Sequence, residues 1–256
     1  DALAGRPLRP ASSPFRVWAQ EAVAEAARRE SEADLWREML SDPPPQWGRR
    51  APDPVRDVLG AMRHHTVSAP APGTDVTEVL LAALVRAFGH GLLVDVERHG
   101  RVELGGTDLT RTVGWFTAVH PLRLDTGSVA DVRDRLRALP GDGIGYGLLR
   151  HLRPRTWPAG LATARIGFNY LGKLTEVPAL GGDPAMPVAH ALEITAAIVG
   201  GELTATWSWL PEVLDDAEVR TLATAWTGHL AEPDPLDVEV SPAELAEWAE
   251  EFGEVH

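Results

Sequence analysis

Two segments of alternating polar and apolar residues, 193–199 and 202–209, flank the pair Gly200-Gly201. Glycine tolerates the positive φ angles that a two-residue hairpin turn requires, so this pattern predicts two antiparallel strands joined at the pair. Polar residues of the second segment fall on one side. The other side carries Leu203, Ala205, Trp207 and Trp209. The fold therefore contains a sheet with one apolar face.

A helix followed at once by a buried strand indicates an α/β fold class. Residues 76–88 place apolar side chains at helical spacing behind Asp75 and Glu78, in a capping-box pattern, and Gly89 ends the helix. Residues 92–96 form a short, nearly continuous apolar run, which is typical of a strand covered on both faces. We therefore expect a sheet with helices packed against it.

Further segments have the spacing of helices, and two stretches have the composition of connections. Pro- and Arg-rich residues from Pro43 to Pro54 suggest a boundary between lobes, and 232–235 reads as a linker. A strand is expected over 165–170. Helices are expected over about 15–28, 35–40, 129–139 (capped by Ser128 and Asp131), 216–226 (capped by Asp215 and Glu218) and 242–252.

Composition excludes several classes of function. The 24 basic and 37 acidic residues give a formal charge of −13, which opposes binding to nucleic acid or to an anionic membrane surface. The chain has no cysteine, and its nine histidines lack metal-ligand spacing, so we expect no thiolate chemistry and no metal site. No apolar run approaches the ~20 residues of a membrane span and no signal pattern opens the chain, so a cytoplasmic location is expected.

Residues 97–101 follow the predicted buried strand and therefore place a carboxylate and an imidazole at the edge of a sheet, where sites are commonly built. Composition alone favours a solvated charged turn there. The aromatic residues of 112–117 and 168–170 would by default belong to a core.

Four motifs in order change this interpretation. They are Glu97-Arg98-His99-Gly100-Arg101-Val102, the segment from Thr112 to Pro121 that begins T-V-G-W-F-T, the segment P-G-D-G-I-G-Y-G over 140–147, and F-N-Y-L-G over 168–172. Together they resemble the epimerisation domains of nonribosomal peptide synthetases, within the condensation-domain superfamily, over roughly residues 1–230.

The resemblance implies a chloramphenicol-acetyltransferase-like fold, in which two α/β lobes form a V around a tunnel. This chain would supply one lobe, a mixed sheet flanked by helices. Residues 1–60 would be the end of the first lobe and the inter-lobe connection, 61–231 the C-terminal lobe, and 232–256 a linker and terminal helix. The tunnel would admit the phosphopantetheine arm of a peptidyl carrier protein, with no cofactor bound directly.

The resemblance also implies roles for single residues. Epimerisation needs an acid and a base on opposite sides of a planar enolate. One is the second histidine of the first lobe's H-H-x-x-x-D-G motif, and the other corresponds to Glu97. Asn169 and Tyr170 correspond to tunnel residues that could hold the thioester oxygen. Contacts to substrate are expected from His99, Arg101, Trp115 and Tyr146.

The chain departs from the family pattern at several positions. His64-His65 does not begin the histidine motif, because Ala69 and Pro70 stand where Asp and Gly are needed, and we expect an exposed strand to begin there. Val102 replaces an acidic residue and His120 a tyrosine. Arg98 replaces a glycine, and a cation beside Glu97 is expected to favour the carboxylate and to narrow the tunnel.

Three functions are compatible with these departures. The first is an epimerisation-type lobe that depends on a first lobe bearing the histidine motif. The second is a non-catalytic platform that recruits tailoring haem monooxygenases to a carrier-bound peptide. The third is a condensation domain that forms peptide bonds, and the wording of the T-V-G-W-F-T and F-N-Y-L-G motifs points away from it.

Overall fold

The computed structural model describes residues 11–42, 47–155, 157, 160–176 and 181–231. The linker expected at 232–235 and the helix expected at 242–252 lie outside these residues. The strands are β1 (Arg63–Pro70), β2 (Leu92–Arg98), β3 (Ala118–Leu124), β4 (Ile166–Leu174), β5 (Leu192–Val199) and β6 (Glu202–Trp209). The α-helices are α1 (Phe15–Arg28), α2 (Ala33–Ser41), α3 (Val76–Phe88), α4 (Val129–Ala138), α5 (Ile144–Leu152) and α6 (Asp216–Ala231).

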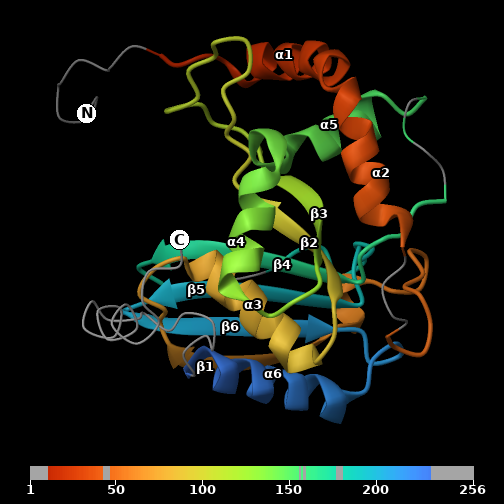
Figure 1. The fold of residues 1–256 in the computed structure, drawn as a ribbon, viewed down its shortest axis with the longest axis vertical. Coiled ribbons are helices and arrows are strands. Elements are labelled where there is room, and N and C mark those ends of the chain that lie inside the picture. The colour runs from red at the N-terminus through yellow and green to blue at the C-terminus, as the bar shows by residue number, and fades with distance from the viewer. Residues whose placement is uncertain (1–10, 43–46, 156, 158–159, 177–180, 232–256) are drawn as a thin grey trace, which may run out of the picture.

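The strands form one mixed sheet in the order β1-β6-β5-β4-β2-β3. β4 is parallel to both of its neighbours, β2 and β5, and the other pairs are antiparallel. Helices α3 and α6 pack against each other near β1, whereas α2 and α5 contact β3 and α1 packs on α5 (Figure 1). The predicted α/β class, a mixed sheet flanked by helices, is confirmed.

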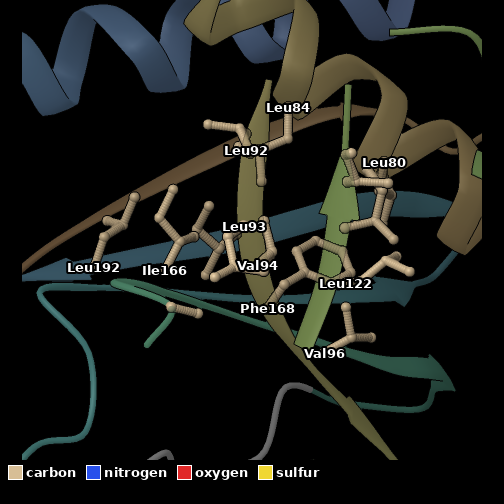
Figure 2. Packing of buried hydrophobic residues seen from close by; sticks show 14 of the residues in the cluster. Leu80, Leu84, Leu92, Leu93, Val94, Val96, Leu122, Ile166, Phe168 and Leu192 are labelled. Atoms are coloured by element: carbon tan, nitrogen blue, oxygen red, sulfur yellow. The ribbon is translucent and has the colours of Figure 1, made fainter. Parts of the chain in front are cut away.

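The core lies between the sheet and α3. Leu80 and Leu84 of the helix meet apolar side chains that β2, β3 and β4 direct toward the same face (Figure 2). Trp226 of α6 closes one end, where its indole N–H donates to the carbonyl of Leu80 at 3.0 Å and its ring packs edge-on against Trp207. Because successive strand residues face opposite sides, the same strands leave a second face for polar residues.

The predicted hairpin is confirmed. β5 and β6 pair from Val199 opposite Glu202 to Leu192 opposite Trp209, and the two turn residues have φ of 61° at Gly200 and 89° at Gly201. The apolar face of β6 is buried along its whole length, as its alternation indicated. In the sheet, this hairpin lies between β1 and β4.

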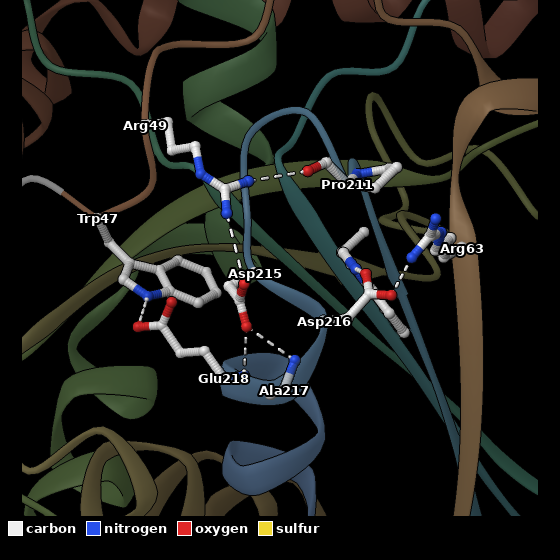
Figure 3. A network of polar contacts seen from close by, with 9 residues as sticks. Trp47, Arg49, Arg63, Pro211, Asp215, Asp216, Ala217 and Glu218 are labelled. Carbon is white, nitrogen blue, oxygen red and sulfur yellow. Dashed lines mark hydrogen bonds and ion pairs between the residues drawn. The ribbon is translucent and has the colours of Figure 1, made fainter.

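The helix boundaries show two corrections. Asp75 adopts a left-handed conformation with φ of 47° and makes no side-chain cap, so the predicted capping box is wrong; its carboxylate instead binds Arg133 at 2.7 Å. Asp215 does cap α6, accepting hydrogen bonds from the backbone N–H groups of Ala217 and Glu218 (Figure 3). The Glu218 side chain accepts from the indole of Trp47 and takes no part in the cap.

Helix α5 and strand β3 were not predicted as regular elements, and β4 runs four residues beyond the expected strand end. The strand expected at His64-His65 is β1, although its extent was not predicted. Among the described residues, no helix combines the length and the apolar character that crossing a bilayer demands.

Candidate functional site

Glu97, near the carboxyl end of β2, meets Asn169 in the middle of β4. The two strands are parallel, with Glu97 in register with Asn169, so both side chains project from the same face and the same edge of the sheet. The Asn169 amide Nδ2 donates to the Glu97 Oε2 at 2.7 Å. Sequence reasoning selected both residues, and the parallel pairing explains why residues 72 positions apart act as neighbours.

A pocket of about 450 Å³ opens at this edge. It brings together four of the predicted site residues, and the rest of its wall comes from the carboxyl end of β2, the middle of β4, the residue before β3 and the start of α3. Its lining residues are Thr77, Val96, Glu97, Arg98, His99, Thr117, Phe168, Asn169, Tyr170, Leu171 and Gly172.

Burial raises the pKa of the Glu97 carboxyl above its ordinary value. The nearby carboxylate of Glu193 raises the pKa further, while His190 and the hydrogen bond from Asn169 lower it. A carboxyl group whose pKa moves toward neutrality exchanges protons more readily at physiological pH than an ordinary glutamate does. The environment of Glu97 therefore has the character of an acid–base site.

Tyr170 stands at the next position along β4 and also lines the pocket. Its ring packs partly against the core, and burial raises the pKa of its phenol, so the hydroxyl remains protonated and can donate a hydrogen bond. His99 is exposed at the pocket rim, where its Nδ1 accepts from the backbone N–H of Arg101 at 3.0 Å.

Arg98 does not act on Glu97 as the sequence suggested. Consecutive strand residues alternate in direction, and the Arg98 guanidinium donates twice to Asp142 Oδ1, at 2.7 and 3.1 Å. The pKa of Glu97 is raised and not lowered. The expectation that the Arg98 cation favours the Glu97 carboxylate is therefore wrong, because the guanidinium of Arg98 is paired with Asp142 instead.

The structure places three predicted substrate contacts outside the pocket lining. Arg101 donates to the carbonyls of Leu109 and Thr112 and holds the 109–112 loop. Trp115 is 83% exposed, which contradicts the default expectation of a core aromatic. Tyr146 is buried, with its hydroxyl bound by Arg150 at 2.7 Å. Their contact with a substrate stays a prediction.

Two histidines considered in the sequence analysis lie in different environments. His64 lies on exposed β1 as expected, with its Nδ1 2.9 Å from the Ser208 hydroxyl. His120 is fully buried beside Gly143, and burial lowers its pKa, so it is a neutral core residue. In the described ranges, no group of three or more His, Asp and Glu side chains is arranged to hold a metal ion.

Sequence reasoning missed three charged residues next to the site. His190, in the segment before β5, lies between Asp95 and Glu193, with its Nε2 2.9 Å from Asp95 Oδ2 and its Nδ1 3.6 Å from Glu193 Oε1. The signal was Asp95 itself, a carboxylate inside the apolar run of residues 92–96, because a charge in a buried strand needs a partner.

The sequence of this chain is similar to parts of several synthases. Chondramide synthase from Chondromyces crocatus is 33% identical over 86% of this chain, and a linear gramicidin synthase from Brevibacillus parabrevis is 32% identical over 62%. The chain spans only 7% and 4% of those two proteins. No family model matches the chain.

Solved structures show the same fold. The epimerization domain from the third module of tyrocidine synthetase B superposes with a TM-score of 0.76 at 23% identity, over 90% of this chain and 61% of that domain. The X-domain in its complex with OxyB from teicoplanin biosynthesis gives a TM-score of 0.58 at 16% identity, over 90% of this chain and 61% of that one. The predicted condensation-type fold is thereby confirmed.

Proposed function

We propose that this chain is the C-terminal lobe of an epimerisation-type domain in the condensation-domain superfamily of nonribosomal peptide synthetases, which it resembles in sequence and fold, and that it acts on an aminoacyl or peptidyl thioester carried by a peptidyl carrier protein. The observation that carries the proposal is Glu97, a half-buried carboxyl of raised pKa, positioned by Asn169 at the mouth of a pocket.

Epimerisation removes the α-proton of the thioester from one face and returns a proton to the other. As Glu97 takes the proton, the electron pair of the Cα–H bond moves into the thioester carbonyl and forms a planar enolate. An acid on the opposite face then protonates Cα, and the proposal assigns that acid to a histidine of a first lobe. Glu97 alone accounts for one half of the reaction.

Asn169 orients the base in this proposal. An amide carries two N–H donors, so donation by one of them to Glu97 is compatible with donation by the other to the enolate oxygen. Tyr170 leaves β4 on the face opposite to Asn169 but also lines the pocket, and the proposal assigns its protonated phenol as a further donor for that oxygen.

The test is stereochemical inversion of a carrier-bound L-aminoacyl thioester by this chain together with a first lobe bearing the histidine motif. Glu97→Gln should reduce formation of the D-isomer by at least about 100-fold, the usual contribution of a positioned acid or base. Glu103→Gln is the matched control, because Glu103 is exposed outside the pocket lining and should leave the rate unchanged. If Glu97→Gln and Glu103→Gln form the D-isomer at equal rates, the proposal is wrong. Scoring dipeptide formation in the same mixtures separates epimerisation from condensation.

The second candidate is a platform that recruits a tailoring haem monooxygenase. Its support is the fold shared with the X-domain that forms a complex with OxyB, together with the arginine at position 98 where epimerisation domains have glycine. A pull-down with such monooxygenases decides between the two. Retention of the oxygenase with no inversion favours the platform, and inversion with no retention favours the enzyme.

A further inference from the structure

The imidazole of His190 fills a gap in the polar face of the sheet. Asp95 of β2, Gly167 of β4 and Glu193 of β5 lie in register across three parallel strands, so they form one row on that face. Gly167 leaves a space between the two carboxylates, and the ring of His190 occupies it. A Cβ at residue 167 would come within 2.6 Å of the His190 Nδ1, so the ring excludes any side chain larger than glycine's hydrogen.

The two carboxylates hold the ring from opposite sides. His190 Nε2 is 2.9 Å from Asp95 and Nδ1 is 3.6 Å from Glu193, and the histidine side chain is only 13% exposed. A neutral imidazole has one N–H, whereas both flanking groups accept hydrogen atoms, so the protonated form fits this position better. Burial lowers the pKa of His190, but the hydrogen bond to Asp95 and the nearby carboxylate of Glu193 outweigh it, and the pKa rises to about 9. We call Asp95, His190 and Glu193 the His190 clamp.

The candidate site is the next row of side chains along the strands that carry the His190 clamp. Two residues further along the same strands, Glu97 is in register with Asn169, and Asn169 with Thr195, on the same face of the sheet. The charged groups that face His190 are therefore Asp95 and Glu97 from β2 and Glu193 from β5. Three carboxyl groups share this area with one cation, and the interactions among them are stronger than in bulk water because the His190 and Asp95 side chains are only 13% and 16% exposed.

We propose that His190 is a positioning residue for Glu97. The positive charge of His190 offsets the neighbouring carboxylates and so sets the protonation state of Glu97. Without the imidazolium, Glu193 and Asp95 would both repel a negative charge on Glu97. Without Glu193, the imidazolium would stabilise that charge more strongly. The two substitutions should therefore change Glu97 in opposite directions, which a merely structural role does not predict. The inference rests on the proposed role of Glu97 in proton transfer.

The test follows the titration of the Glu97 carboxyl by carbon NMR in protein labelled at the glutamate carboxyl carbon. The signal is assigned by its loss in Glu97→Gln. His190→Gln should raise the Glu97 pKa by about one pH unit, and Glu193→Gln should lower it by a similar amount, as expected for single charges at this range in a partly buried site. The double variant should return close to the wild-type value.

The matched control is His64→Gln, an imidazole on exposed β1 that is hydrogen-bonded to Ser208. It should leave the Glu97 titration unchanged. Unchanged Glu97 titration in both clamp variants, or a change of the same sign in both, overturns the inference. If His190→Gln fails to fold, Glu193→Gln alone still decides, since a rise or no change in the Glu97 pKa refutes the inference.

The titration does not depend on catalysis, so the two proposals fail separately. Opposite changes in the Glu97 pKa together with no epimerisation would retain the charge coupling and reject the function. Inversion that requires Glu97, together with an unresponsive Glu97 titration, would retain the function and reject the role of His190.

Discussion

The stability of this protein should decline at alkaline pH because of one histidine. The pKa of His190 is raised from 6.5 to about 9, so the folded state binds its proton more tightly than the unfolded chain does. A raised pKa contributes stability that is fully present below 6.5 and is lost as the pH rises through about 9. Each pH unit corresponds to about 1.4 kcal/mol, so the interval is worth about 3 kcal/mol of unfolding free energy.

The measurement is urea denaturation of wild type and His190→Gln at intervals from pH 6 to pH 10. The difference in unfolding free energy between the two proteins should shrink by about 3 kcal/mol across that range, because the glutamine does not titrate. Both proteins share the other eight histidines, and the chain has no cysteine, so the difference between wild type and His190→Gln isolates the one substituted residue. A difference that stays constant from pH 6 to pH 10 would refute the reasoning.

Three further predictions concern stability and are measured by the same denaturation. Gly167→Ala should lower the unfolding free energy by about 2 kcal/mol, because the added Cβ collides with the imidazole of His190. The control Gly147→Ala, inside α5 with open space around it, should raise the unfolding free energy by up to about 1 kcal/mol. Equal effects of the two substitutions would contradict the close approach of His190 to Gly167. Trp226→Phe should cost about 1–3 kcal/mol through the lost hydrogen bond and the space left in the core, against less than about 0.5 kcal/mol for exposed Trp115→Phe; similar losses would argue against this packing. Glu97→Gln should raise the unfolding free energy by up to about 1 kcal/mol at pH 7 and by less near pH 4, because a carboxyl of raised pKa makes the folded protein less stable as the pH rises. A lower unfolding free energy of the variant at pH 7 would mean that other interactions compensate for the burial of Glu97.

The sequence predicted best where local periodicity and tertiary burial agree. The hairpin around Gly200 is an example, because turn geometry and alternation both depend on residues adjacent in the chain. The extent of β1 and the whole of β3 escaped detection because both strands pair with partners distant in sequence: Arg63 pairs with Trp209, and Ala118 with Arg98. The capping box at Asp75 failed because Arg133, 58 residues away, binds the carboxylate that was expected to cap the helix.

In the candidate site, too, features that depend on local sequence were predicted and features that depend on distant partners were not. Glu97, Asn169 and Tyr170 could be selected from the motifs that carry the family resemblance, and the parallel pairing of β2 with β4 brings them to one pocket. The direction of the Arg98 side chain could not be inferred, because its partner Asp142 lies in a turn with positive φ. His190 lies between carboxylates from two strands, and no local pattern in the sequence marks it.

The central claim, that Glu97 exchanges the α-proton of a carrier-bound thioester, is tested most directly by deuterium uptake at the α carbon. The chain, a first lobe with the histidine motif and an aminoacyl carrier protein are combined in deuterated water, and the mass of the released amino acid is measured by mass spectrometry. We predict incorporation of one α-deuterium that disappears in Glu97→Gln and persists in Glu103→Gln. Incorporation that is unaffected by Glu97→Gln would contradict the account.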